Sequence, residues 1–178
     1  LTINLEAADL LAAHVARLVG DAAVAVVSPD AGGIKRADRF RDALAARLGR
    51  AVGAAFAEKY RSEGALRGEA LVGDVRGAVA VIVDDLVSAG HTLDRAARAC
   101  REQGATRVIA AATHGVFAGE ADTVLAASPI DRLVVTDTIP GARLSDPALL
   151  ARLDRIPVAP LLARSIRSLS PGVSDLSG

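Results

Sequence analysis

The chain has 178 residues, of which 51% are hydrophobic and 24% charged, and its 21 basic residues balance its 21 acidic ones. This hydrophobic content excludes an intrinsically disordered chain. The balanced charge argues against binding to nucleic acid or to a membrane surface, because both need a positive surface. No apolar run approaches the roughly 18 residues of a membrane span. A single cysteine excludes an internal disulfide and favours a cytoplasmic location.

Short apolar runs alternate along the chain with segments of helical periodicity, beginning with an expected helix at 7–19 and an expected strand at 23–27. Further helices are expected at 36–48, 93–103 and 160–169, and further strands at 52–57, 79–83, 108–112, 132–136 and 156–158. The charged segment 58–68, which is interrupted by glycines, predicts a mobile loop. This alternation predicts an α/β fold with a mostly parallel sheet, formed by one domain over 1–170 and a tail at 171–178.

Two acidic residues, Asp84 and Asp85, follow the expected strand at 79–83, which is apolar on both faces and therefore typical of the middle of a parallel sheet. Burying unpaired carboxylates costs several kcal/mol each, so this pair needs hydroxyl donors, a cation or water. The turn that follows contains small residues and precedes a helix, where backbone N–H groups bind phosphate. The pattern suits a sugar phosphate, although an ordinary turn capped by Thr92 is the alternative.

A second turn between a strand and a helix, at 28–37, carries Asp30, Gly32 and Gly33. Paired glycines permit close approach of the backbone to a ligand. Asp30 is expected to join Asp84 and Asp85 around Mg²⁺, since this ion prefers hard oxygen ligands. The alternative is a Gly-Gly turn in which Asp30 only caps the helix.

Both turns, together with 112–119 (ATHGVFAG), 134–140 (VVTDTIP) and 158–162 (VAPLL), resemble the ribose-phosphate diphosphokinases, also called phosphoribosyl pyrophosphate synthetases. The resemblance runs from about residue 26 to the tail. Members of this family contain two homologous domains of the type I phosphoribosyltransferase-like, Rossmann-like fold, each a twisted sheet flanked by helices. The resemblance implies that this chain is the second domain and that an amino-terminal half, which supplies much of the ATP site, is missing. The lack of a methionine at position 1 agrees with a fragment.

The family transfers the diphosphoryl group of ATP to the 1-hydroxyl of ribose 5-phosphate. The resemblance implies a ribose 5-phosphate site that consists of Asp84, Asp85, Ser88, Ala89, Gly90, His91 and Thr92. It also implies that Asp30, Asp84 and Asp85 hold Mg²⁺, and that Lys59 and Arg61 are catalytic residues of a flexible loop. ATP and other copies of the chain are the implied partners, and the fragment alone is expected to be inactive.

We call the turn at 88–92 the phosphate turn. The common form of the family reads Asp-Asp-x-x-Asp-Thr-Gly-Gly-Thr over the positions 84–92, and this chain departs from it at Ser88, Ala89 and His91. His91 is expected either to face the phosphate or to point to solvent. For His114, a structural role or a contact on the ATP side is preferred over a general base. Two other functions stay open at this point: a stand-alone type I phosphoribosyltransferase, and a non-catalytic regulatory homologue of the synthetase.

Overall fold

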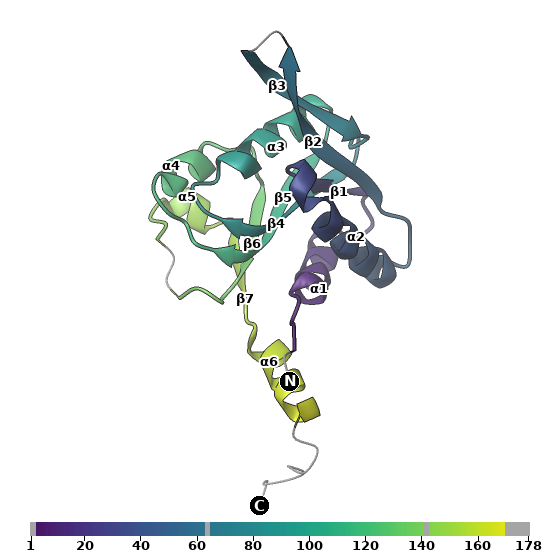
Figure 1. Cartoon of the computed structure of the whole chain (residues 1–178), viewed down its shortest axis with the longest axis vertical. Helices are drawn as coiled ribbons and strands as arrows, with labels where there is room; N and C mark the ends of the chain where they lie inside the picture. Colours follow the sequence, from purple (N-terminus) through teal and green to yellow (C-terminus); the bar gives the residue numbers. More distant parts are fainter. Residues whose placement is uncertain (1–2, 63–64, 141–142, 170–178) are drawn as a thin grey trace, which may run out of the picture.

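Helices and strands alternate along the chain in the computed structural model, which describes residues 3–62, 65–140 and 143–169 (Figure 1). The helices are α1 (Ala8–Val19), α2 (Ile34–Leu48), α3 (His91–Glu102), α4 (Ala121–Ala126), α5 (Pro147–Leu150) and α6 (Ala159–Leu169), and a 3₁₀ turn, η1, spans Ala31–Gly33. The strands are β1 (Val24–Ser28), β2 (Gly53–Ser62), β3 (Ala65–Gly73), β4 (Val79–Val87), β5 (Arg107–Gly115), β6 (Arg132–Thr136) and β7 (Leu153–Ile156). Within these residues, no helix is both long enough and apolar enough to cross a bilayer.

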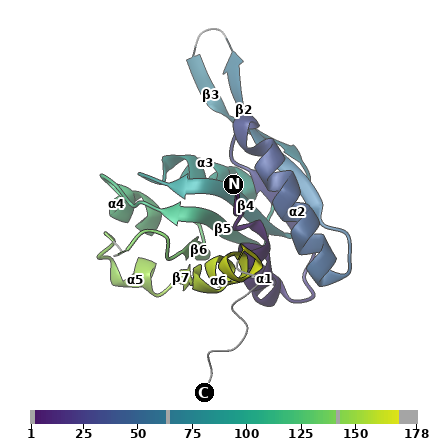
Figure 2. The same ribbon diagram turned by 60° about the horizontal axis from the view of Figure 1, so that its bottom comes forward.

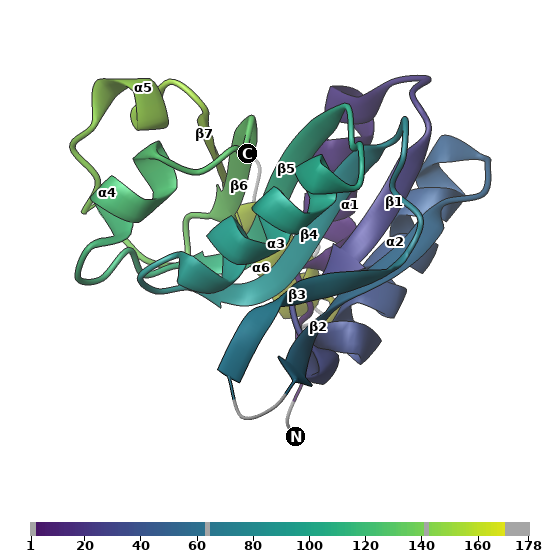
Figure 3. The ribbon, with the colours of Figure 1, turned by 90° about the horizontal axis from the view of Figure 1, so that it is seen from above.

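The strands form one sheet in the order β3-β2-β1-β4-β5-β6-β7, and its neighbouring strands run parallel except for the antiparallel pair β2 and β3. Figure 3 shows α3 on one face of the sheet and α1 and α2 on the other. Apolar side chains of α3, α4 and α5 form the core on the first face, and those of α1 and α2 form the core on the second. The predicted α/β fold with a mostly parallel sheet is therefore confirmed.

The strand order reverses between β1 and β4, which are neighbours at the centre of the sheet. The chain leaves β1 through α2 toward one edge of the sheet, and it leaves β4 through α3 toward the other edge. Ligands of open parallel sheets bind where the connections diverge in this way, at the carboxyl ends of the strands. The two turns singled out in the sequence therefore meet at the one point of the sheet where this rule places a binding crevice.

Several predicted boundaries are wrong. The segment 58–68 was expected to be a loop, but its described residues, 58–62 and 65–68, belong to the antiparallel pair β2 and β3, which extends beyond the other strands in Figure 2. Residues 63–64 of this segment lie outside the described part of the chain. Strand β4 continues to Val87 instead of ending at Val83, so Asp84 and Asp85 lie within the strand. The last strand lies at Leu153–Ile156 and not at 156–158. The predicted tail at 171–178 lies outside the described residues.

Candidate functional site

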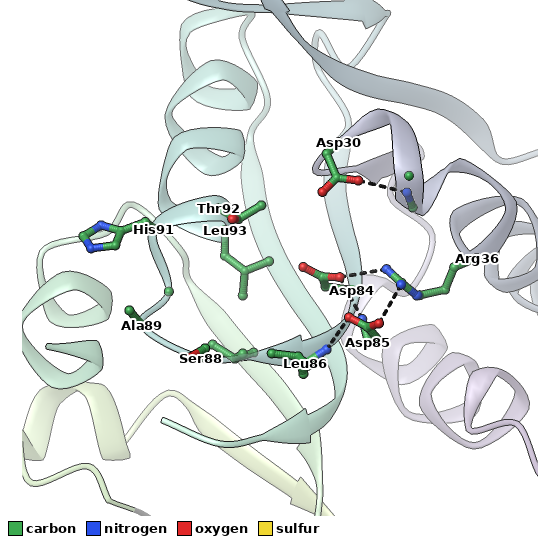
Figure 4. A pocket seen from close by; sticks show the side chains of 14 residues that line it. Asp30, Arg36, Asp84, Asp85, Leu86, Ser88, Ala89, His91, Thr92 and Leu93 are labelled. Atoms are coloured by element: carbon green, nitrogen blue, oxygen red, sulfur yellow. Dashed lines mark hydrogen bonds and ion pairs between the residues drawn. The ribbon is translucent and has the colours of Figure 1, made fainter. Parts of the chain in front are cut away.

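A cavity of about 560 Å³ opens at the carboxyl ends of β1 and β4 (Figure 4). Its walls come from the turn around η1, the start of α2, the end of β4 and the start of α3. The residues predicted from the sequence that line it are Asp30, Asp84, Asp85, Ser88, Ala89, Gly90, His91 and Thr92. The fold thus gathers the predicted sugar-phosphate residues around one space. Lys59 and Arg61 are on β2, but their side chains lie outside the described part of the chain, so their catalytic role stays a prediction.

The acid pair consists of one largely buried and one exposed carboxylate. The side chain of Asp84 is 17% exposed and that of Asp85 is 57% exposed. The Asp85 backbone N–H donates to Asp84 Oδ1 at 2.8 Å, and the Leu86 N–H donates to Asp85 Oδ1 at 2.9 Å, so each carboxylate is held by the next residue's amide. Burial raises the pKa of Asp84 to about 6, against the opposing effects of the Asp85 amide and of Arg36. A cation that binds beside Asp84 therefore favours the ionised form of its carboxylate.

Arg36, at the start of α2, bridges the two acids. Its Nη1 lies 2.7 Å from Asp84 Oδ1, and its Nη2 lies 2.9 Å from Asp85 Oδ2. The dashed lines of Figure 4 mark both contacts. Sequence reasoning missed this residue, because it lies 48 positions from Asp84 and no local pattern connects the two.

The turn after β4 leads directly into α3, whose cap residue is Gly90. Gly90 has φ 88°, and a Cβ there would lie 2.8 Å from Leu125 Cδ2, so both the backbone conformation and the packing require glycine. In the described part of the chain, no side-chain hydrogen bond caps the start of this helix. The first N–H groups of a helix have no acceptor within it, so donors for an anion are available at the cavity. The expected alternative, in which Thr92 caps the helix, is wrong.

His91 turns away from the acid pair in Figure 4, and its Nε2 lies 2.8 Å from Glu120 Oε1. A further contact comes from the stretch after β5: the N–H groups of Val116 and Phe117 donate to Val87 O, at 3.0 and 2.9 Å. Phe117 is buried and has φ 48°, a left-handed conformation that is uncommon for a residue other than glycine. The stretch 112–119 is thus hydrogen-bonded to the end of β4, where the phosphate turn begins.

Asp30 accepts a hydrogen bond from the Gly33 N–H at 2.9 Å and caps η1. Among residues 3–62, 65–140 and 143–169, no three His, Cys, Asp or Glu side chains are grouped as metal ligands. The structure therefore does not join Asp30 to the acid pair as the sequence predicted. The two carboxylates alone still fit Mg²⁺, which is usually held by one or two carboxylates together with substrate oxygens and water.

A second cavity, of about 430 Å³, adjoins the acid pair on the side of the sheet that α1 and α2 cover. It shares Gly32, Arg36, Asp84 and Asp85 with the first cavity. His114 also lines the second cavity, where its Nδ1 lies 2.7 Å from Thr138 Oγ1.

The curated relatives of similar sequence include ribose-phosphate pyrophosphokinases from several bacteria. A ribose-phosphate pyrophosphokinase of Neisseria meningitidis serogroup A is 42% identical over 147 residues, which cover 82% of this chain and 42% of the relative. One from Xylella fastidiosa is 41% identical over 172 residues, which cover 96% of this chain and 51% of the relative. The chain therefore spans about half the length of the curated relatives it matches.

The crystal structure of phosphoribosylpyrophosphate synthetase from Mycobacterium smegmatis superposes with a TM-score of 0.77 at 34% identity, covering 93% of this chain and 51% of that one. This similarity confirms the predicted fold of the phosphoribosyltransferase type. The family model described as the phosphoribosyl synthetase-associated domain matches residues 65–175, which is more than half of the chain. The chain belongs to the phosphoribosyl synthetase-associated domain family.

Proposed function

We propose that residues 1–170 form a single domain that binds ribose 5-phosphate as one half of a phosphoribosyl pyrophosphate synthetase. The observation that carries this proposal is the cavity at the reversal point of the sheet, which is lined by the acid pair and by the start of α3, whose cap residue is a glycine. An anion site beside two carboxylates matches a molecule with a phosphate at one end and hydroxyl groups at the other. The similarity to a synthetase over 93% of the chain supports this choice over other sugar phosphates.

In this proposal the backbone N–H groups between Ser88 and Thr92 donate hydrogen bonds to the 5-phosphate. The side-chain hydroxyl groups of Ser88 and Thr92 are two further donors. Helix N-termini favour such anions because their N–H groups have no acceptor in the helix. Asp84 and Asp85 accept hydrogen bonds from the ribose hydroxyls or hold Mg²⁺, which supplies positive charge for phosphoryl oxygens when it is bound. Asp30, already engaged at η1, faces the same space from the opposite wall.

For the complete enzyme we propose transfer of the diphosphoryl group of ATP to the 1-hydroxyl of the sugar, with release of AMP. Lys59 and Arg61 then supply positive charge to the transferred group, a role in which positioned cations contribute much of the rate. In this proposal an amino-terminal half of the protein supplies much of the ATP site. The enzyme is a homo-oligomer, and it works in the cytoplasm. The chain by itself binds the sugar without transferring the diphosphoryl group.

The binding half of the proposal is tested by titrating the chain with ribose 5-phosphate in a calorimeter, with Mg²⁺ present. The D84N/D85N variant loses hydrogen bonds to charged acceptors and is expected to bind at least about tenfold more weakly. Asp42→Asn, an equivalent change on the exposed face of α2, should bind as the parent does. Equal affinity of the acid-pair variant and the parent would refute the proposed site.

The catalytic half of the proposal is tested on the full-length protein by following AMP release from ATP, Mg²⁺ and ribose 5-phosphate. AMP release by the parent, with a lower rate in the Lys59→Ala variant, supports the synthetase. Loss of this transition-state donor should raise the activation barrier by roughly 3 kcal/mol or more. A folded full-length protein that binds the sugar but releases no AMP would instead identify a regulatory homologue.

A further inference from the structure

The guanidinium of Arg36 occupies the space between the two carboxylates of the acid pair. It meets Asp84 and Asp85 through different nitrogens, at 2.7 and 2.9 Å, so both acids are engaged by one cation. All three side chains line the same cavity as the phosphate turn. A divalent cation or a pair of sugar hydroxyls that used both carboxylates would need the same position.

The local structure guides Arg36 to this position. The residue lies in the first turn of α2, where the positive end of the helix dipole disfavours a cation, so the helix itself does not explain the placement. A Cβ on Gly33 would lie 3.3 Å from Arg36 Nη1 and 2.7 Å from Ser28 Oγ. The side chain therefore passes over a glycine whose missing Cβ leaves it room, and it ends on the acid pair.

Charge also favours an exchange of partners. Two carboxylates and one guanidinium leave one negative charge at the acid pair, so the pair still attracts a divalent cation while Arg36 is in place. A divalent cation bound to the two carboxylates would lie close to the guanidinium of Arg36, and the two positive groups would repel each other. Arg36 is 36% exposed, and once released it has a new class of partner, because guanidinium groups bind phosphoryl oxygens through paired hydrogen bonds.

We propose that Arg36 is an internal counter-ion of the acid pair, which a divalent cation must displace in order to bind there. The metal part of this inference stands without the proposed function, whereas the identity of the sugar that accompanies the metal rests on it. Arg36 is thus a positioning residue. It forms ion pairs with both carboxylates in the free protein, and these ion pairs break when the divalent cation binds.

The test measures Mn²⁺ binding by electron paramagnetic resonance, with the metal alone and then with ribose 5-phosphate. A neighbouring charge changes proton binding to a carboxylate by one to three log units, so Arg36→Gln should tighten Mn²⁺ binding by roughly tenfold. The matched control is Arg41→Gln, which removes the same charge from the same helix, where Arg41 pairs with Asp38 and Asp42 and lines neither of the two cavities at the acid pair. The control should leave Mn²⁺ affinity within about twofold of the parent, as expected for an exposed pair.

Equal or weaker Mn²⁺ binding by the Arg36 variant would overturn the inference, as would the absence of Mn²⁺ binding in every variant. The unmodified chain gives a second readout that needs no substitution: the side-chain N–H signal of Arg36 in a nitrogen-15 spectrum should shift on titration with Mg²⁺, while that of Arg41 should not. A static Arg36 signal during saturating Mg²⁺ binding would also overturn it.

The sugar separates the two proposals. If Arg36→Gln tightens Mn²⁺ binding but no variant binds ribose 5-phosphate, the counter-ion inference holds and the proposed function fails. If the parent binds the sugar and Arg36→Gln leaves Mn²⁺ affinity unchanged, the proposed function holds and the inference fails.

Discussion

Replacing Asp84 by asparagine should make the protein more stable at neutral pH. The carboxylate is largely buried, and its burial raises the pKa to about 6 from an ordinary value of 3.8. Asparagine has the same shape, and its oxygen still accepts the hydrogen bond that Asp85 N–H donates to Oδ1. The substitution therefore removes a buried charge while it keeps the backbone contact.

The sign and size follow from proton linkage. Because the folded chain holds the Asp84 proton up to a higher pH than the unfolded chain does, the unfolding free energy falls as pH rises from about 4 to about 6. A difference of roughly two pH units corresponds to about 3 kcal/mol at most, at 1.36 kcal/mol per unit. The D84N variant lacks this loss, so its advantage over the parent should be small near pH 4 and complete above about pH 6.

Urea unfolding of both proteins at pH 4, 5, 6 and 7 measures this difference, because carboxylates common to both proteins cancel in the subtraction. The Asp42→Asn variant serves as control, since Asp42 is 74% exposed and should change stability by less than about 0.5 kcal/mol. Parallel stability curves for the parent and D84N across this range would refute the link between Asp84 burial and stability.

Gly90→Ala should weaken ribose 5-phosphate binding and cost about 1–3 kcal/mol of stability, because the new Cβ meets Leu125 and a φ of 88° is strained for alanine. Calorimetry measures the affinity and urea unfolding the stability, and unchanged values of both would refute the packing argument. Arg152→Leu should cost about 3 kcal/mol in urea unfolding, because Arg152 donates to four backbone carbonyls around α4; a loss below about 1 kcal/mol would contradict this. Burial raises the pKa of the Cys100 thiol to about 12, so iodoacetamide at pH 8 should label only unfolded chains, and rapid labelling of folded protein would show the opposite.

The sequence predicted the centre of the sheet better than its edges. The strand Arg132–Thr136 has the predicted bounds, and the strand at 79–83 was placed correctly in the middle of the sheet because apolar residues on both faces require cover on both sides. The first part of β2 was predicted as a strand at 52–57, but its continuation and β3 were missed, because the segment 58–68 is charged and interrupted by glycines while its described backbone pairs along an edge of the sheet. Such pairing depends on a neighbouring strand and not on apolar periodicity.

The same contrast holds at the site. The acid pair and the phosphate turn are consecutive in the chain, so their joint presence at one cavity followed from local reasoning. The position of Arg36 did not, because it results from how α2 lies against β4. For Asp30 the sequence left two roles open, a metal ligand and a cap of the Gly-Gly turn. The structure shows the cap, in which Asp30 accepts a hydrogen bond from the Gly33 N–H.

The two cavities at the acid pair share one set of charges. Asp84, Asp85 and Arg36 line both the first cavity, beside α3, and the second, beside α1 and α2. Any ion that settles in one cavity alters the electrostatic potential in the other. Thermodynamic reciprocity then requires that two occupants change each other's affinity by the same factor, whichever enters first. An ion that never reaches the phosphate turn can thus still set how tightly the turn holds its own ligand.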